Sequence, residues 1–291
     1  MIYRIHHVTS YGYSEPVLLA HHMAHLMPRP LPWQHCRRTN LRIRPQPTGG
    51  ERDGTDYFGN AVHFFTLADA HRSLTVETLS RVELLHRPCP EEGDTPPLSV
   101  ALEALEIGKT AVETAEFRYA SPLAAPFAQL TAYAMPSFAD ARPILAGLRD
   151  LMHRIHADFT YDATATTIAT PLERVFTERR GVCQDFAHLG IACLRGLGLP
   201  ARYVSGYLLT RPPPGRERLR GADASHAWLS VFVPGHGWID FDPTNDTIPD
   251  MEHITTAWGR DFDDVSPLKG VMLGGGEQSL KVAVDVEPIS D

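Results

Sequence analysis

Long apolar runs, paired cysteines and long runs of one charge are all missing from this chain of 291 residues. No stretch approaches the ~20 consecutive apolar residues that a membrane-spanning helix needs. The chain starts directly with a strand-like pattern and not with a signal peptide. Its net charge of −8 argues against nucleic acid or an anionic membrane as the main partner. We therefore expect a cytoplasmic protein.

The cysteines show no Cys-x-x-Cys motif and no paired spacing. They are Cys36, Cys89, Cys183 and Cys193. The last two fall on one predicted helix, where they would lie ~15 Å apart. That distance is too long for a disulfide bond, so a reducing compartment fits best.

Histidines gather at His21, His22 and His25, which raises the question of a metal site. On a strand, His21 and His25 point to one side and His22 to the other. No cysteine or carboxylate joins them nearby, so a strand with polar edges is the better interpretation. We expect neither a metal nor another cofactor.

The chain divides into three parts. Residues 1–90 contain several short alternating runs separated by Gly, Pro and Asp, which predicts an N-terminal β-sandwich domain. Residues 91–138 are predicted to be a linker with short helices, and residues 139–291 a second domain. Within that domain, apolar spacing predicts a helix over 141–157. A capping box at 170–173 predicts the start of another.

Residues 181–199 combine a turn with a helix that carries Cys183 in its first turn. Phe186, Ile191 and Leu194 fall on one face of this helix and predict its buried stripe. The positive end of the helix dipole and unpaired backbone N–H groups favour a thiolate at Cys183. Because the thiolate is the nucleophilic form of cysteine, this is the candidate site of chemistry.

A predicted β-hairpin downstream supplies a candidate base and a carboxylate. Residues 225–233 and 238–242 form its strands. If the loop covers 234–237, Asp242 falls on the wrong face for His226. If Gly237 starts the return strand instead, His226 and Asp242 become diagonal neighbours roughly 7–8 Å apart at the backbone. The hairpin geometry allows this pairing but does not force it.

The order and spacing of these blocks resemble the transglutaminase-like core of bacterial proteins, within the papain-like thiol enzyme group. The blocks are GVCQDFAHL, GLPARYVSGYL, SHAWLSVF and GWIDFDPTND. Residues 1–85 resemble the N-terminal domain that accompanies this core, and residues 257–265 resemble its closing segment. The resemblance implies an α+β fold, in which a helix bearing the cysteine packs on an antiparallel sheet bearing the histidine and the aspartate.

Carried onto this sequence, the resemblance implies Cys183 as nucleophile, His226 as base and Asp242 as orienting carboxylate. The backbone N–H of Cys183 is the expected first oxyanion donor. An upstream aromatic side chain can serve as the second donor in this enzyme group, and Tyr161 is the candidate; packing under the helix is the alternative. Trp228 shares a face with His226 and is expected to shield the triad from solvent.

Some neighbouring residues invite a catalytic role but are better explained as structural. Asp240 shares the face of Asp242, yet Pro243 follows Asp242 in the family's Asp-Pro-Thr block. His188 points away from Cys183 around the helix, and we expect a packed core residue. Asp185 suits the helix dipole. The Pro-rich segment 210–224 is expected to be an exposed loop, with a rim or lid over the site as the alternative.

The reaction expected is acyl transfer from a peptide or amide carbonyl through a Cys183 thioester. Attack by water would make the protein a cysteine protease or amidase, which we prefer because no feature concentrates an amine. Attack by an amine would make it a transglutaminase. A non-catalytic binding or scaffold module is the third interpretation. The expected partner is a peptide or protein substrate, and a homo-oligomer is also allowed.

Overall fold

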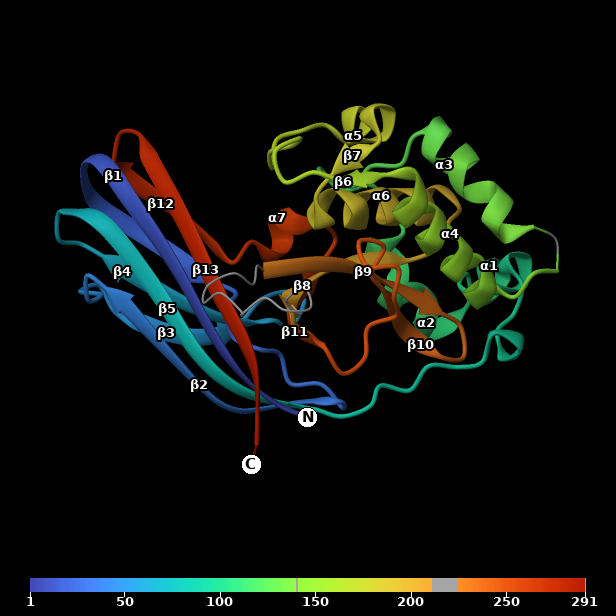
Figure 1. The fold of residues 1–291 in the computed structure, drawn as a ribbon, viewed down its shortest axis with the longest axis horizontal. Helices are drawn as coiled ribbons and strands as arrows, with labels where there is room; N and C mark the ends of the chain where they lie inside the picture. Colours follow the sequence, from blue (N-terminus) through green and yellow to red (C-terminus); the bar gives the residue numbers. More distant parts are fainter. Residues whose placement is uncertain (140, 211–224, 291) are drawn as a thin grey trace, which may run out of the picture.

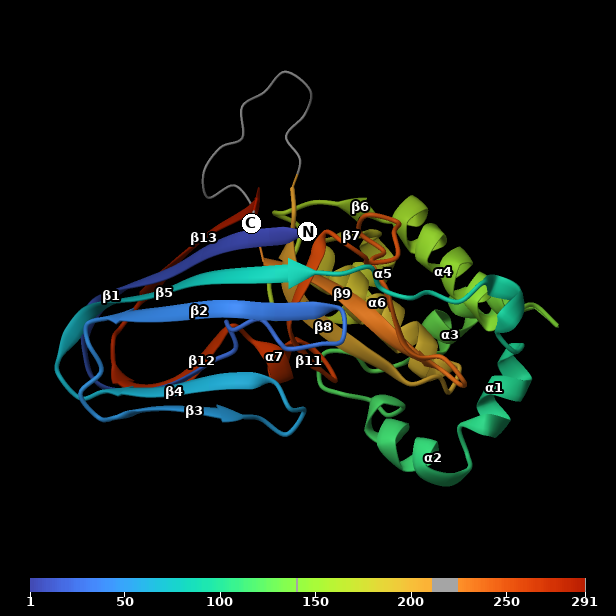
Figure 2. The same ribbon diagram turned by 90° about the horizontal axis from the view of Figure 1, so that it is seen from below.

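The computed structural model describes residues 1–139, 141–210 and 225–290, and it contains two regions (Figures 1 and 2). The first is a seven-stranded antiparallel sheet in the order β2-β5-β1-β4-β3, with β12 and β13 also paired to β1. Its strands are β1 (Ile2–Ala24), β2 (Gln34–Arg44), β3 (Glu51–Thr55), β4 (Ala61–Leu67), β5 (His71–Leu84), β12 (Leu268–Gly274) and β13 (Gln278–Ile289).

The long strand β1 explains why this region is a single sheet. Its first half pairs with β5 and β13, and its second half with β4 and β12. The pairing with β5 shifts between Gly12 and Val17, where β1 passes from one set of partners to the other. Both halves therefore share one hydrogen-bonded strand, and the predicted β-sandwich of two separate sheets is not confirmed.

The C-terminal strands correct the expected second domain, 139–291. Residues 268–289 pair with β1 and complete the N-terminal sheet. Val284 and Val286 on β13 are fully buried in a cluster with Ile5 on β1. Residues 280–286 alternate with a period of two residues, which indicates a strand but does not say which sheet the strand joins.

The second region packs helices onto a four-stranded antiparallel sheet in the order β10-β9-β8-β11. The sheet strands are β8 (Ala201–Leu208), β9 (Ser225–Val233), β10 (Gly237–Phe241) and β11 (His253–Gly259). The helices are α1 (Leu98–Ala104), α2 (Gly108–Thr114), α3 (Ala128–Ala134), α4 (Ile144–Asp158), α5 (Leu172–Glu178), α6 (Cys183–Gly196) and α7 (Phe262–Val265). No helix among the described residues is both long and apolar enough to cross a membrane.

Helix α6 lies at the centre of this region, between α4 and the sheet. Phe186, Ile191 and Leu194 are buried with the apolar face of α4, as their spacing predicted. Gly190 lets α6 approach β9 closely, since a Cβ there would lie 2.6 Å from the Leu229 side chain. Packing on both faces therefore fixes the position of the first turn of α6.

The capping box expected at 170–173 is wrong. Helix α5 begins after Pro171 without a side-chain cap, because the Thr170 hydroxyl accepts a hydrogen bond from the Thr167 amide at 2.9 Å instead. A threonine that satisfies its own turn is not free to cap the next helix.

Two side-chain amides join the regions along the outer edge of β11. The Gln34 amide group exchanges hydrogen bonds with the backbone N–H and C=O of Thr255, at 2.8 and 2.7 Å. Asn60 does the same with Trp258, at 2.9 and 2.8 Å. These amides take the place of a neighbouring strand, so the edge of the small sheet is not left open.

Candidate active site

The residues before Cys183 fix the start of α6. The Asp185 carboxylate accepts a hydrogen bond from the Val182 backbone N–H at 2.8 Å and from the Thr166 hydroxyl at 2.6 Å. Gly181 makes this possible, because a Cβ there would lie 2.6 Å from the Asp185 oxygen. Asp185 is thus a capping residue, and it leaves Cys183 half-buried at the first helical position.

The hairpin of β9 and β10 adopts the register that can join His226 to Asp242. Gly237 pairs with Val233 and starts the return strand. Asp242 follows β10, and its Oδ2 lies 2.8 Å from Nε2 of His226. Both side chains are buried, and His226 also hydrogen-bonds Cys183. The structure therefore brings together the three residues that the sequence pointed to.

Two further side chains hold the Asp242 carboxylate, and neither was singled out from the sequence. Oδ2 also accepts hydrogen bonds from Nδ2 of Asn245 at 2.7 Å and from Nε2 of His253 at 2.9 Å. Asn245 follows in the turn after Asp242, so its proximity could have been expected. His253 comes from β11, and no sequence pattern placed it there.

The pKa values of His226 and Asp242 shift in opposite directions. Burial lowers the pKa of His226, but hydrogen bonds to Asp242 and Cys183 outweigh it and raise the pKa to about 10. Burial likewise raises the pKa of Asp242, and the hydrogen bonds from His226 and His253 hold it well below its usual range. At neutral pH the imidazole is therefore protonated and the carboxylate ionised.

The hydrogen bond to Asp242 also determines which ring nitrogen of His226 faces the sulfur of Cys183. Because Nε2 of His226 is bonded to Asp242, Nδ1 is the nitrogen left for Cys183. The imidazolium can then donate one N–H to each side, to the carboxylate and to a thiolate.

A pocket of about 340 Å³ exposes this cluster. It is lined by Tyr161, Cys183, Leu208, Thr210, Ser225, His226, Thr244 and Asn245. The short strands β6 (Thr160–Tyr161) and β7 (Arg180–Gly181) pair Tyr161 with Gly181, two residues before the nucleophile candidate. Tyr161 is 57% exposed, so it does not pack under the helix. The segment 210–224 was expected to be an exposed loop, with a rim or lid as the alternative, and its residues 211–224 lie outside the described residues.

The expectation that Trp228 shields the triad from solvent stays a prediction. Its side chain is fully buried and does not line the pocket. The indole N–H donates to Oδ2 of Asp240 at 2.9 Å, while the ring packs 5.9 Å from that of His226. Asp240 is further engaged by Arg87. Trp228 and Asp240 thus form core support behind His226.

The side chains of His226, Asp242 and His253 resemble a metal site, because their ligand atoms lie within 4.8 Å of one another. The oxygen of Asp242 lies only 2.8 and 2.9 Å from the two ring nitrogens. Ligands of a tetrahedral zinc are about 3.3 Å apart, given metal–nitrogen bonds near 2.0 Å. The observed distances fit hydrogen bonds better than metal coordination.

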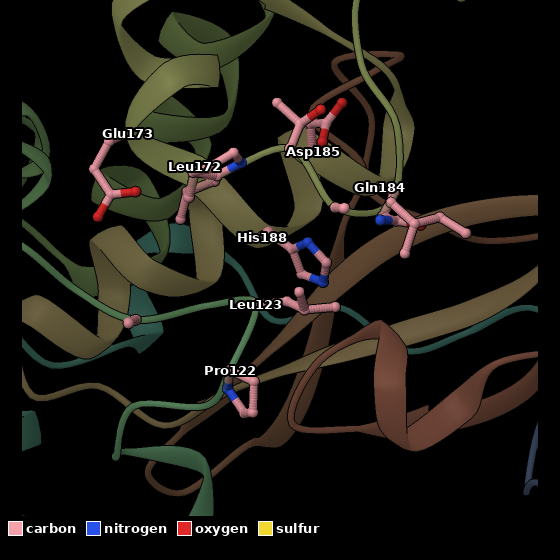
Figure 3. Close-up of a pocket in the computed structure, with 12 residues that line it drawn as sticks. Pro122, Leu123, Leu172, Glu173, Gln184, Asp185 and His188 are labelled. Carbon is pink, nitrogen blue, oxygen red and sulfur yellow. The ribbon is translucent and has the colours of Figure 1, made fainter.

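A second pocket, of about 280 Å³, lies on another side of α6 (Figure 3). Its lining comes from residues 168–173 and from Pro122, Leu123, Ala125, Gln184, Asp185 and His188. His188 is buried, as expected, and its Nε2 accepts a hydrogen bond from the Phe262 backbone N–H at 3.1 Å. Burial lowers the pKa of His188 to about 4.

Known proteins resemble this chain over nearly its whole length. Residues 3–83 match the bacterial transglutaminase-like N-terminal region, and residues 132–243 match the transglutaminase-like superfamily. An uncharacterized protein of Mycobacterium tuberculosis is 41% identical over 98% of this chain and 92% of its own length. The chain belongs to the transglutaminase-like superfamily.

Two other comparisons place this transglutaminase-like protein among its neighbours. A solved structure from Cytophaga hutchinsonii, named as a candidate cysteine protease, matches with a TM-score of 0.76, 20% identity and coverage of 100% of this chain and 91% of that one. At this identity the likeness establishes the fold. A protein-glutamine gamma-glutamyltransferase of Pseudomonas aeruginosa is 31% identical over 100 residues, which is 32% of this chain and 15% of the enzyme.

Proposed function

We propose that this protein cleaves a peptide or amide bond through a thioester on Cys183. One observation carries the proposal: Cys183 hydrogen-bonds His226, His226 is 2.8 Å from Asp242, and the first two residues line an open pocket. A sulfur, an imidazole and a carboxylate in this sequence of contacts form an activated nucleophile. Membership of the superfamily supports thiol-dependent acyl transfer in general.

The chemistry runs in two halves. The Cys183 thiolate attacks the carbonyl carbon, and the protonated Nδ1 of His226 gives its proton to the departing amine as the carbon–nitrogen bond breaks. Water then enters, His226 takes a proton from it, and the resulting hydroxide attacks the thioester to release the acid and the thiolate. Asp242 keeps the ring oriented and stabilises its charged form throughout.

The oxyanion formed on the substrate needs hydrogen-bond donors. The backbone N–H of Cys183 is one, because amides in the first turn of a helix have no acceptor within that helix. The Tyr161 hydroxyl is the second, since this side chain lines the same pocket as Cys183. Burial, and next the charge on Cys183, raise the pKa of Tyr161, which keeps the phenol protonated and able to donate.

Water is favoured as the acyl acceptor because the pocket is open on the Tyr161 side and water at ~55 M is always present. Transfer to an amine is the second candidate. The similarity to the Pseudomonas aeruginosa gamma-glutamyltransferase supports it. A peptide or protein substrate, a cytoplasmic location and homo-oligomer formation all stay predictions.

One experiment tests the proposal and separates its two forms. Glutamine-containing peptides are incubated with the protein, with and without a primary amine, and the products are identified by mass spectrometry. We expect cleavage or deamidation by the native protein, none by Cys183→Ala, and normal turnover by the matched control Cys89→Ala. Amine incorporation would favour transglutaminase chemistry. Turnover by Cys183→Ala would overturn the assignment of the nucleophile.

Alkylation by iodoacetamide near neutral pH gives an independent test. Cys183 should react fastest, because His226 stabilises its thiolate. Cys193 should stay unlabelled in the folded protein, since burial raises its pKa to about 12 and the side chain is inaccessible. Peptide mapping measures the order of labelling. A Cys183 that reacts no faster than the exposed Cys89 would contradict an activated thiolate.

A further inference from the structure

The second pocket borders the same helical turn as the nucleophile. Cys183 lines the first pocket, and the next residue, Gln184, lines the second. Figure 3 draws His188 between the Gln184–Asp185 turn and Leu123. The two pockets therefore lie on either side of the N-terminal turn of α6.

His188 presents an unused hydrogen-bond donor to this pocket. Its Nε2 accepts a hydrogen bond from the Phe262 N–H, so Nε2 carries no proton and the ring proton sits on Nδ1. The residue is 4% exposed and lines the pocket, and no hydrogen bond from Nδ1–H to a described residue is found. Nδ1 is not one of the fully buried side-chain atoms without a partner, so water reaches it from the pocket, and a ligand that supplies an acceptor there replaces that water.

Asp185 and Glu173 add carboxylate acceptors to the pocket, while Thr170 and Gln184 add groups that can donate or accept. Oδ2 of Asp185 is used by Thr166 and Val182, whereas Oδ1 has no partner among the described residues. The Glu173 carboxylate also lines the pocket. Most remaining lining residues are apolar: Pro122, Leu123, Ala125, Ile168, Ala169, Pro171 and Leu172.

This combination selects a ligand that is neutral and carries both an acceptor and a donor. A carboxylate would be repelled by Asp185 and Glu173, and an ammonium group would offer no acceptor to His188. An amide offers a carbonyl oxygen and an N–H together. Aliphatic carbon beside it can rest on the apolar walls.

We propose that this pocket binds an uncharged amide group of the peptide substrate, with its carbonyl on Nδ1–H of His188 and its N–H on a carboxylate of the pocket. The proposal rests on the function proposed above, and it makes the pocket a subsite beside the reacting bond. Cys183 and His188 are ~7.5 Å apart along the helix axis and ~140° apart around it, so a bound peptide would have to pass around the N-terminal turn of α6 to reach both.

Binding is tested by NMR on protein labelled with ¹⁵N-histidine. Titration with N-methylacetamide, a secondary amide, should shift the Nδ1–H signal of His188, and the Cys183→Ala variant should respond equally. Acetamide in a parallel titration distinguishes a primary carboxamide from a backbone-like amide by which probe binds more tightly. Failure of both amides to move the signal, at concentrations where the protein stays folded, would overturn the proposal.

Variants that fill the pocket provide the matched controls. Ala169→Phe places a ring in the pocket, whereas Ala163→Phe adds the same ring to an exposed position of the same loop that does not line it. Ala169→Phe should abolish the His188 response and Ala163→Phe should not. Ala125→Phe fills the pocket from the opposite wall, should the first variant disturb the loop.

Kinetics with substrates of two lengths connect the pocket to turnover. Ala169→Phe should lower kcat/KM for an extended peptide about tenfold, the equivalent of one lost hydrogen bond of about 1.4 kcal/mol. It should leave kcat/KM for a minimal acyl ester unchanged. An equal loss for both substrates would refute the subsite. Absence of turnover in the native protein would refute the proposed function, while the NMR titration would still decide the pocket.

Discussion

His226 and His188 lie on two sides of one helix terminus and titrate in opposite directions. Both are largely buried, and in both burial is the largest influence and lowers the pKa. His226 hydrogen-bonds Asp242 and Cys183, and its pKa rises to about 10, whereas that of His188 falls to about 4. Burial alone therefore makes a neutral hydrogen-bonding ring, and the hydrogen bonds to Asp242 and Cys183 make a protonated one.

Removing the anion behind His226 should have the largest effect. In Asp242→Asn the carboxylate charge is lost, and the pKa of His226 should fall from about 10 towards that of His188. The wrong tautomer would also be favoured, so kcat should drop by about 10³-fold or more. Histidine NMR and steady-state kinetics measure the two effects.

Asp240→Asn is the matched control for that substitution, because Asp240 is a buried carboxylate on β10, two residues before Asp242. It bonds Trp228 and Arg87 and not His226. Its loss should destabilise the fold and leave the His226 titration in place. If both variants moved that titration equally, the special role of Asp242 would be disproved.

Substitution of His253, which also binds the Asp242 carboxylate, should have a smaller effect on activity. It donates to the same Asp242 oxygen as His226, so His253→Leu should let the carboxylate turn and lower kcat about tenfold. His253→Gln keeps an N–H near the position of Nε2 and should retain most activity. The pH profile of kcat/KM should shift in the Leu variant only; a shift in both variants would point to general loss of packing.

The smallest expected effect is the contribution of His188 to the pH dependence of the free energy of unfolding. The folded pKa of His188, about 4, lies below its ordinary value of 6.5, so the stability it contributes is present above pH 6.5 and lost as pH falls towards 4. The His226 contribution runs the other way: it is present below pH 6.5 and lost as pH rises towards 10.

His188→Gln should therefore remove about 1–2 kcal/mol of the destabilisation seen between pH 7 and pH 5. Glutamine can still accept from the Phe262 N–H, so the packing is largely kept. Urea unfolding at the two pH values measures the difference. An unchanged pH dependence in this variant would show that His188 is not held neutral by its surroundings.

Local features of the site could be predicted from the sequence. The period of apolar residues gave helix α6 with Cys183 in its first turn, and the Pro-Gly turn restricted the β9–β10 hairpin to two registers. Both are short-range properties, set by side chains a few residues apart.

Contacts between segments that lie far apart in the chain could not be predicted from the sequence. His253 reaches Asp242 because β11 pairs with β8, and nothing near His253 in the chain indicates that pairing. Alternation placed Trp228 on the face of His226, but it could not give the Asp240 carboxylate that the buried indole binds. The sandwich prediction was not confirmed for a related reason: strands were recognised, but their partners were not.

The pairing of β13 with the first half of β1 ties the start of the sheet to the last strand of the described chain. A fragment ending near residue 90 would leave one side of β1 with a row of unsatisfied backbone groups and would expose Ile5 where Val284 and Val286 now cover it. We therefore expect that the region that matches the family's N-terminal model does not fold on its own. Its sheet closes only after the intervening helices and strands have returned the chain to β1.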